Sequence, residues 1–136
     1  MKKMLLVLSL LWVGNSIAQT IPTLAKEWVG TTSLTMYNAA PKWWNFSDKP
    51  ASLTVMEQQQ NHLDLLYKSG NYEARMVGTI SADGSTIQLG NTEVFGSYTL
   101  RDGRLVGCGS KRGGSVVYVS ATGSYATWCD DLKAAK

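Results

Sequence analysis

The chain has 136 residues with a formal net charge of +3, and 44% of its residues are hydrophobic while 17% are charged. This length suits one domain built around one core. After Lys2-Lys3, the longest run of basic residues is the pair Lys111-Arg112, which we interpret as a solvated turn. The composition therefore excludes the basic surface of a nucleic-acid-binding protein.

Residues 1–18 have the layout of a secretory signal peptide. A positive start, Met1-Lys2-Lys3, precedes the apolar run 4–13, and small residues follow at Ser16 and Ala18, the −3 and −1 positions of a cleavage site. The apolar run is about ten residues long, whereas a membrane-spanning helix needs roughly twenty. We therefore expect a periplasmic or secreted protein, with a single mature domain at 19–136 and no membrane span in it.

The mature chain is close to neutral and contains both cysteines. Loss of Lys2 and Lys3 leaves 11 basic residues against 10 acidic ones. In an oxidising compartment Cys108 and Cys129 most simply pair with each other, and such a disulfide would contribute about 3 kcal/mol. A metal site or a reactive thiol is the alternative, but His62 is the only histidine, so metal ligands are scarce.

The first strand is expected at 27–37, after a flexible lead-in at 19–25. The regular pattern then stops, and 38–50 contains Pro41, Pro50 and the pair Trp43-Trp44. We expect this segment to be a long loop, and such loops in compact domains are usually functional.

The rest of the chain is predicted to be a series of short strands joined by tight turns. Asp83-Gly84 and Asp102-Gly103 supply the positive φ angles that hairpin turns need. Strands are expected at 52–58, 62–67, 72–80, 86–89, 94–100, 104–109 and 115–120, with a ninth short one at 125–129 and a polar tail at 130–136.

This pattern predicts an all-β fold, an eight-stranded antiparallel up-and-down barrel with one disulfide. No apolar period of a helix longer than two turns is present, and the short loops favour strands that pair in chain order. An open meander of this length would leave two exposed edges. We therefore expect the last strand to pair with the first, and the disulfide to hold it against the strand at 104–109.

The chain resembles the calycin superfamily, which includes lipocalins, avidins and fatty-acid-binding proteins. The resemblance rests on Glu27-Trp28-Val29-Gly30 at the start of the first strand, the irregular segment 38–50 and the hairpin series 52–120. It implies a ligand-binding barrel. In size, compartment and single disulfide the chain is also similar to small periplasmic lysozyme inhibitors and to lipocalin-like inhibitors of secreted metalloproteases.

The sequence gives little support to an enzyme. A hydrolytic triad needs a base beside a nucleophile, and His62 lies at a strand start beside Asn61. The carboxylate pair Asp130-Asp131 falls in the predicted polar tail, where we expect it to be solvated. No phosphate-binding loop or metal-ligand spacing occurs, so we expect no catalytic residues, no metal and no cofactor.

The aromatic residues offer the best candidate site. Trp28 is expected in the core, at one end of the barrel. Trp43 and Trp44 are adjacent, so at least one of them should be partly exposed at the barrel mouth. The candidate ligand-binding residues combine a mouth with possible wall positions: Tyr37, Trp43, Trp44, Phe46, Met56, Met76, Tyr98 and Tyr118.

Two functions follow as hypotheses. The first is a binding protein for a small apolar or aromatic molecule in the barrel mouth. The alternative is a periplasmic inhibitor of a lysozyme or secreted protease, whose partner would bind the 38–50 segment around Trp43-Trp44.

Overall fold

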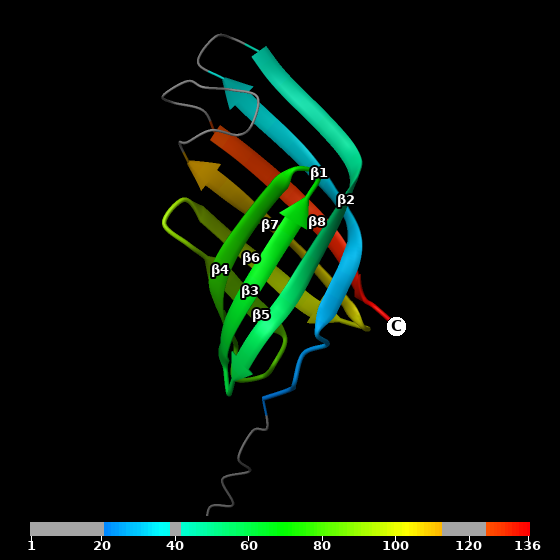
Figure 1. Ribbon diagram of the computed structural model, residues 1–136, viewed down its shortest axis with the longest axis vertical. Coiled ribbons are helices and arrows are strands. Elements are labelled where there is room, and N and C mark those ends of the chain that lie inside the picture. Colours follow the sequence, from blue (N-terminus) through cyan, green and yellow to red (C-terminus); the bar gives the residue numbers. More distant parts are fainter. Residues whose placement is uncertain (1–20, 39–41, 113–124) are drawn as a thin grey trace, which may run out of the picture.

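The computed structural model describes residues 21–38, 42–112 and 125–136, and they form one closed β-barrel (Figure 1). Eight antiparallel strands pair in chain order, and the described residues contain no helix. The strands are β1 (Glu27–Asn38), β2 (Lys42–Gln59), β3 (His62–Ser69), β4 (Tyr72–Ile80), β5 (Thr86–Gly90), β6 (Val94–Arg101), β7 (Arg104–Arg112) and β8 (Tyr125–Ala134). The predicted all-β, up-and-down barrel of eight strands is confirmed.

Pairing between β1 and β8 closes the barrel. The ladder runs from Trp28 opposite Ala134 to Tyr37 opposite Tyr125. The predicted polar tail at 130–136 is wrong, because β8 continues through Asp130 and Asp131 to Ala134. The strand predicted at 115–120 lies outside the described residues.

The long loop predicted at 38–50 is also wrong, because residues 42–50 form the first half of β2. They pair with β1, with Trp43 opposite Tyr37 and Trp44 opposite Met36. Aromatic residues fit a pleated strand well, which here outweighs Pro50. Pro50 is tolerated because β2 begins to pair with β3 only at the next residue, so its missing N–H interrupts no bond to that strand.

The barrel interior is filled by one face of every strand. Along β8, alternate residues from Ala126 to Leu132 are buried and the residues between them are more exposed. Fully buried aliphatic side chains come from six strands: Leu53, Leu65, Ile80, Ile87, Leu105 and Leu132. The segment before β1 lies at the lower end in Figure 1, and its Leu24 closes this end together with Trp28 at the start of β1. Trp28 is 3% exposed and its indole N–H donates to the Ala25 carbonyl, so its prediction as a core residue is confirmed.

The Cys108–Cys129 disulfide joins directly opposite positions of β7 and β8, as predicted. Both cysteines are exposed: Trp128 and Asp130 take the inward positions on either side of Cys129, and Cys108 stands opposite Cys129 on the outer face. The disulfide therefore links the two strands on the outer face of the barrel.

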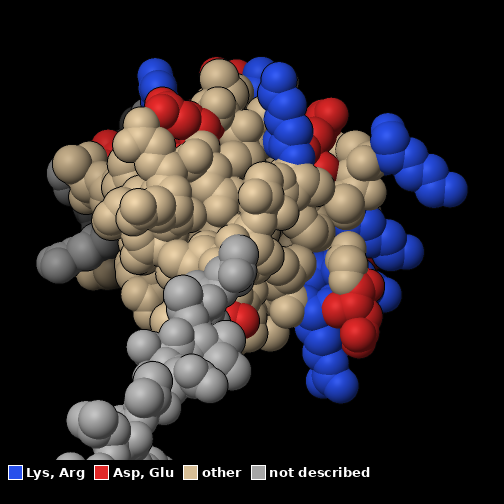
Figure 2. Space-filling model, turned by 90° about the horizontal axis from the view of Figure 1, so that it is seen from below, with Lys and Arg blue, Asp and Glu red and all other residues tan. Residues whose placement is uncertain are grey.

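The outer surface carries charges of both signs. Figure 2 shows this from the closed end of the barrel, where uncharged residues dominate and Lys or Arg lies near Asp or Glu at the rim. Arg104 pairs with Asp131 and Arg101 with Asp102. In the described part of the chain, no helix is long and apolar enough to cross a membrane.

Candidate functional site

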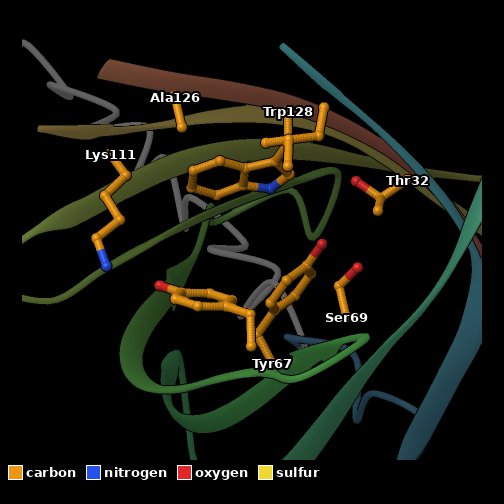
Figure 3. Close-up of a pocket in the computed structure, with 8 residues that line it drawn as sticks. Thr32, Tyr67, Ser69, Lys111, Ala126 and Trp128 are labelled. Carbon is orange, nitrogen blue, oxygen red and sulfur yellow. The ribbon is translucent and has the colours of Figure 1, made fainter. Parts of the chain in front are cut away.

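A pocket of about 90 Å³ lies inside the barrel toward the end that carries the β3–β4 turn. Five strands contribute its walls, and almost all of its surface is apolar. Figure 3 shows Trp128 and Tyr67 facing one another across it, with Lys111 at one side and Thr32 and Ser69 at the other. The lining residues are Thr32, Leu34, Tyr67, Ser69, Tyr72, Lys111, Ala126 and Trp128.

Three aromatic rings form the main walls. The Tyr67 ring centroid lies 6.2 Å from that of Trp128 and 6.3 Å from that of Tyr72. These are ordinary separations for interacting aromatic side chains. The three rings therefore hold one another in place around the pocket.

A glycine on β7 makes room for the Trp128 indole. Gly109 stands directly opposite Trp128 in the β7–β8 ladder. A Cβ atom at Gly109 would overlap the indole ring. The ring can lie over β7 only because this position carries no side chain.

Asp130 lies beneath these rings, in the barrel interior. Its side chain is buried, with the residue only 2% exposed. The Tyr67 hydroxyl donates to Asp130 Oδ1 at 3.0 Å, and the Tyr98 hydroxyl donates to Oδ2 at 2.5 Å. The Trp128 indole N–H in turn donates to the Tyr98 oxygen at 3.1 Å. A connected polar network thus supports two of the pocket's aromatic walls.

Burial sets the protonation behaviour of this network. It raises the pKa of the Asp130 carboxyl, although hydrogen bonds, including those from both tyrosine hydroxyls, oppose the shift. Burial and the nearby Asp130 charge also raise the pKa values of Tyr67 and Tyr98 well above their usual range. Both hydroxyls therefore stay protonated and act as donors.

Lys111 stands at the rim of the pocket. The prediction of a solvated turn is wrong for this residue, which is near the end of β7 and only 9% exposed. Its Nζ lies 3.1 Å from Glu93 Oε2 and 5.0 Å from the centre of the Tyr72 ring. Burial raises the pKa of Tyr72, while the Lys111 charge works in the opposite direction.

The structure distributes the predicted wall residues unequally. Tyr98 and Met76 face the interior, with exposures of 1% and 2%. Tyr98 supports the site through Asp130, whereas Met76 packs in the core and is not part of the pocket lining. The prediction of Met56 as a wall residue is wrong, because it is 54% exposed: Leu53 and Val55 take the inward positions, so Met56 points outward.

The predicted mouth residues lie together on the β1–β2 hairpin. Phe46 is half-buried and stands opposite Leu34, which lines the pocket. Tyr37 is opposite Trp43 in the same ladder, and Trp44 follows. The side chains of these three, and all of Tyr118, lie outside the described residues.

Sequence reasoning missed Tyr67, Tyr72, Lys111, Trp128 and Asp130 as parts of the site. The strand alternation carried a usable signal for the last two. Continued from Ala126, it places Trp128, Asp130 and Leu132 on one face, but two adjacent aspartates are more typical of a solvated polar tail.

No family model, curated protein or solved structure matches this chain. The resemblance to calycins therefore stays a prediction. Among residues 21–38, 42–112 and 125–136, no three His, Cys, Asp or Glu side chains gather as metal ligands would. Fold and geometry define the molecule as a small closed β-barrel with an aromatic pocket at one end.

Proposed function

We propose that this protein is a periplasmic or secreted binding protein for a small apolar or aromatic molecule. The ligand would enter the described pocket and lie against Trp128, Tyr67 and Leu34. The predicted signal peptide at 1–18 supports export, and the disulfide fits an oxidising compartment. No catalytic role is part of the proposal.

The observation that carries the proposal is the contrast between the two ends of the barrel. One end is filled by Trp28, Leu24 and fully buried aliphatic side chains. The other leaves about 90 Å³ between aromatic walls. An apolar hollow with a few polar groups at its margin is the usual form of a small-molecule site.

The volume limits the size of the group that binds. Drug-sized pockets measure roughly 300–1,000 Å³, and an engineered apolar cavity of about 150 Å³ holds benzene. The pocket is smaller than that cavity, so it suits a short branched chain or part of a single ring, with the rest of the ligand reaching toward the mouth.

The test is a calorimetric titration of the mature protein with single-ring and short-chain compounds. Ala126 lines the pocket and is buried, so Ala126→Leu should fill part of the hollow and weaken binding at least tenfold. Thr127→Leu is the matched control, because the next residue of β8 points outward and should leave binding unchanged. Near-ultraviolet circular dichroism checks that both variants fold.

Two results would overturn the proposal. One is a wild-type protein that binds none of the compounds, and the other is equal binding by Ala126→Leu and wild type. Capture of a lysozyme or a secreted protease by the same protein, lost on Trp43→Ala, would instead favour the inhibitor alternative. Its contact would then be the β1–β2 hairpin rather than a loop.

A further inference from the structure

We propose that the pocket selects a small carboxylic acid in its anionic form, with the carboxylate bound by Lys111 and the apolar part against Trp128. This inference rests on the proposed function and names the chemical class of its ligand. The position of the Lys111 amino group supports this inference.

Lys111 is held where a ligand's polar end would lie. Its side chain runs along the pocket wall and is only 10% exposed. The Tyr72 ring, 5.0 Å from Nζ, supports the ammonium by a cation–π contact. Figure 3 places this amino group at the side of the pocket opposite Thr32 and Ser69.

The described lining of the pocket is electrostatically one-sided. Lys111 is the only charged residue among its eight lining residues. Asp130 is not one of them, and a tyrosine hydroxyl donates to each of its carboxylate oxygens. A ligand in the pocket therefore meets a positive charge directly, while the nearest interior carboxylate is shielded by Tyr67 and Tyr98.

Glu93 neutralises Lys111 only in part. The carboxylate belongs to the β5–β6 turn, and its side chain is 53% exposed. A lysine ammonium has three donors, and among the described residues Lys111 makes one ion pair, to Glu93 Oε2 at 3.1 Å. A ligand carboxylate can accept a hydrogen bond from a second N–H group of Lys111 on the less solvated side of the ammonium. A charged hydrogen bond is stronger there than it is in water.

Geometry also favours an anion over an amine. An ammonium group on the ligand would lie beside Lys111 and be repelled by it. Its attraction to Glu93 would be screened by solvent at the exposed rim. The same pocket should therefore discriminate among ligands of one shape by their charge.

Three probes of similar shape test this inference: benzoate, benzamide and benzylamine. In calorimetry at neutral pH we expect wild type to bind benzoate about tenfold more tightly than benzamide, which corresponds to about 1.4 kcal/mol. Benzylamine should be the weakest of the three. Lys111→Met keeps the aliphatic wall and should bring benzoate down to the affinity of benzamide.

Two further variants make the result specific. Lys68→Met removes a lysine that pairs with Glu73 and is 51% exposed, so it should leave the preference for benzoate intact. Glu93→Gln should strengthen benzoate binding several-fold, because it releases the Lys111 ammonium. This variant also tests the inference if Lys111→Met fails to fold.

The outcomes separate the two proposals. Binding of all three probes without a preference for benzoate, or a preference that survives Lys111→Met, would overturn the anion inference and leave the pocket standing. Unchanged or weaker benzoate binding by Glu93→Gln would also count against it. Binding of none of the probes by wild type would overturn both.

Discussion

Asp130 is buried in the barrel interior, whereas an aspartate side chain is normally exposed to solvent. It is 2% exposed, and its two oxygens accept hydrogen bonds from Tyr67 and Tyr98. A buried carboxyl with two neutral donors is tolerated because each oxygen keeps a partner. An aliphatic residue at this position would remove the acceptor that both hydroxyls share in the interior.

The raised pKa of Asp130 gives a prediction about stability and pH. A carboxyl whose pKa is higher in the folded state contributes most below its unfolded value, near 3.8, and that contribution is lost as the pH rises through the folded pKa. Asp130→Asn removes the titration and keeps an oxygen acceptor. Its unfolding free energy should therefore improve relative to wild type as the pH increases from below 4 to 7, measured by urea denaturation at a series of pH values.

The comparison with wild type is needed because other carboxyls titrate in the opposite sense. Hydrogen bonds from Ser81 and Ser85 lower the pKa of Asp83 to about 2, and Arg75 lowers that of Asp64. Asp131→Asn is the control: this neighbour pairs with Arg104 and should show no such relative gain. A relative loss of stability by Asp130→Asn with rising pH would contradict the prediction.

A second prediction at this scale concerns the close contact of Gly109 with Trp128. Gly109→Ala should lower the unfolding free energy by about 1–3 kcal/mol, because the new methyl group overlaps the indole and must displace it. The displaced ring should also narrow the pocket and weaken ligand binding. Thermal unfolding and the calorimetric titration measure the two effects.

Ser110→Ala provides the control for this variant. Ser110 is the next residue of β7 and is exposed, so its substitution should change the unfolding free energy by less than about 0.5 kcal/mol. Wild-type stability in Gly109→Ala would show that the indole can shift without cost.

At the scale of the strands, β7 and β8 carry much of the site on one face and the disulfide on the other. Their inward residues include Gly109, Lys111, Trp128 and Asp130, whereas Cys108 and Cys129 point outward. The disulfide therefore constrains the two strands without occupying the interior. Loss of the disulfide should lower the free energy of unfolding and have a smaller effect on the pocket.

The double variant Cys108→Ser/Cys129→Ser tests this division. The disulfide closes a loop with a sequence separation of 21, so its removal should lower the unfolding free energy by about 3 kcal/mol. Denaturation in urea measures the loss. The remaining ladder should keep the barrel closed, as judged by an unchanged far-ultraviolet spectrum.

Reduction supplies the control for the double variant. Dithiothreitol should destabilise wild type by a similar amount and leave the variant unaffected. Equal stability of wild type with and without the disulfide would show that the strand pairing alone sets the free energy of this region.

The observed strands also show which parts of the fold can be predicted from the sequence alone. Alternation and Asp-Gly turns located β4 at 72–80 and placed the other strands from β3 to β7 within two or three residues of their observed ends. The sequence patterns failed at 42–50, where Pro50 suggested a loop. Pro50 is tolerated in β2 because pairing with β3 starts only at the next residue, and this depends on the register of the two strands. A short stretch of sequence does not determine which strand it pairs with across the barrel.

The site was harder to predict for the same reason. Tyr67, Trp128 and Lys111 come from β3, β8 and β7, and only closure of the barrel brings them together. A buried Asp130 makes sense only when Tyr67 and Tyr98 are both within hydrogen-bonding distance. Composition favours a site built from aromatic side chains, but most walls of the described pocket come from other strands than the predicted mouth residues on the β1–β2 hairpin.

At the scale of the whole molecule, stability depends on the ladder between the first and last strands. Leu132 is fully buried in the core, and Ala135 donates a backbone hydrogen bond to Glu27 at 2.9 Å. Both lie near the C-terminus, opposite the beginning of β1. The last residues of β8 therefore close the barrel as well as complete its core.

Truncation after Asp131 should abolish cooperative unfolding. It removes the buried Leu132 side chain, whose loss alone costs about 2–5 kcal/mol, and the ladder from Trp28 opposite Ala134 to Gly30 opposite Leu132. A domain of this size has a total stability of about 5–15 kcal/mol, so the combined loss leaves little or no folded protein. Thermal unfolding followed by circular dichroism should show no sharp transition.

Truncation after Ala135 is the matched control, because it removes only the exposed Lys136 and keeps the bond to Glu27. This variant should unfold like wild type. If the chain ending at Asp131 also unfolded cooperatively at the wild-type temperature, the barrel would not need residues 132–134 of β8 for closure.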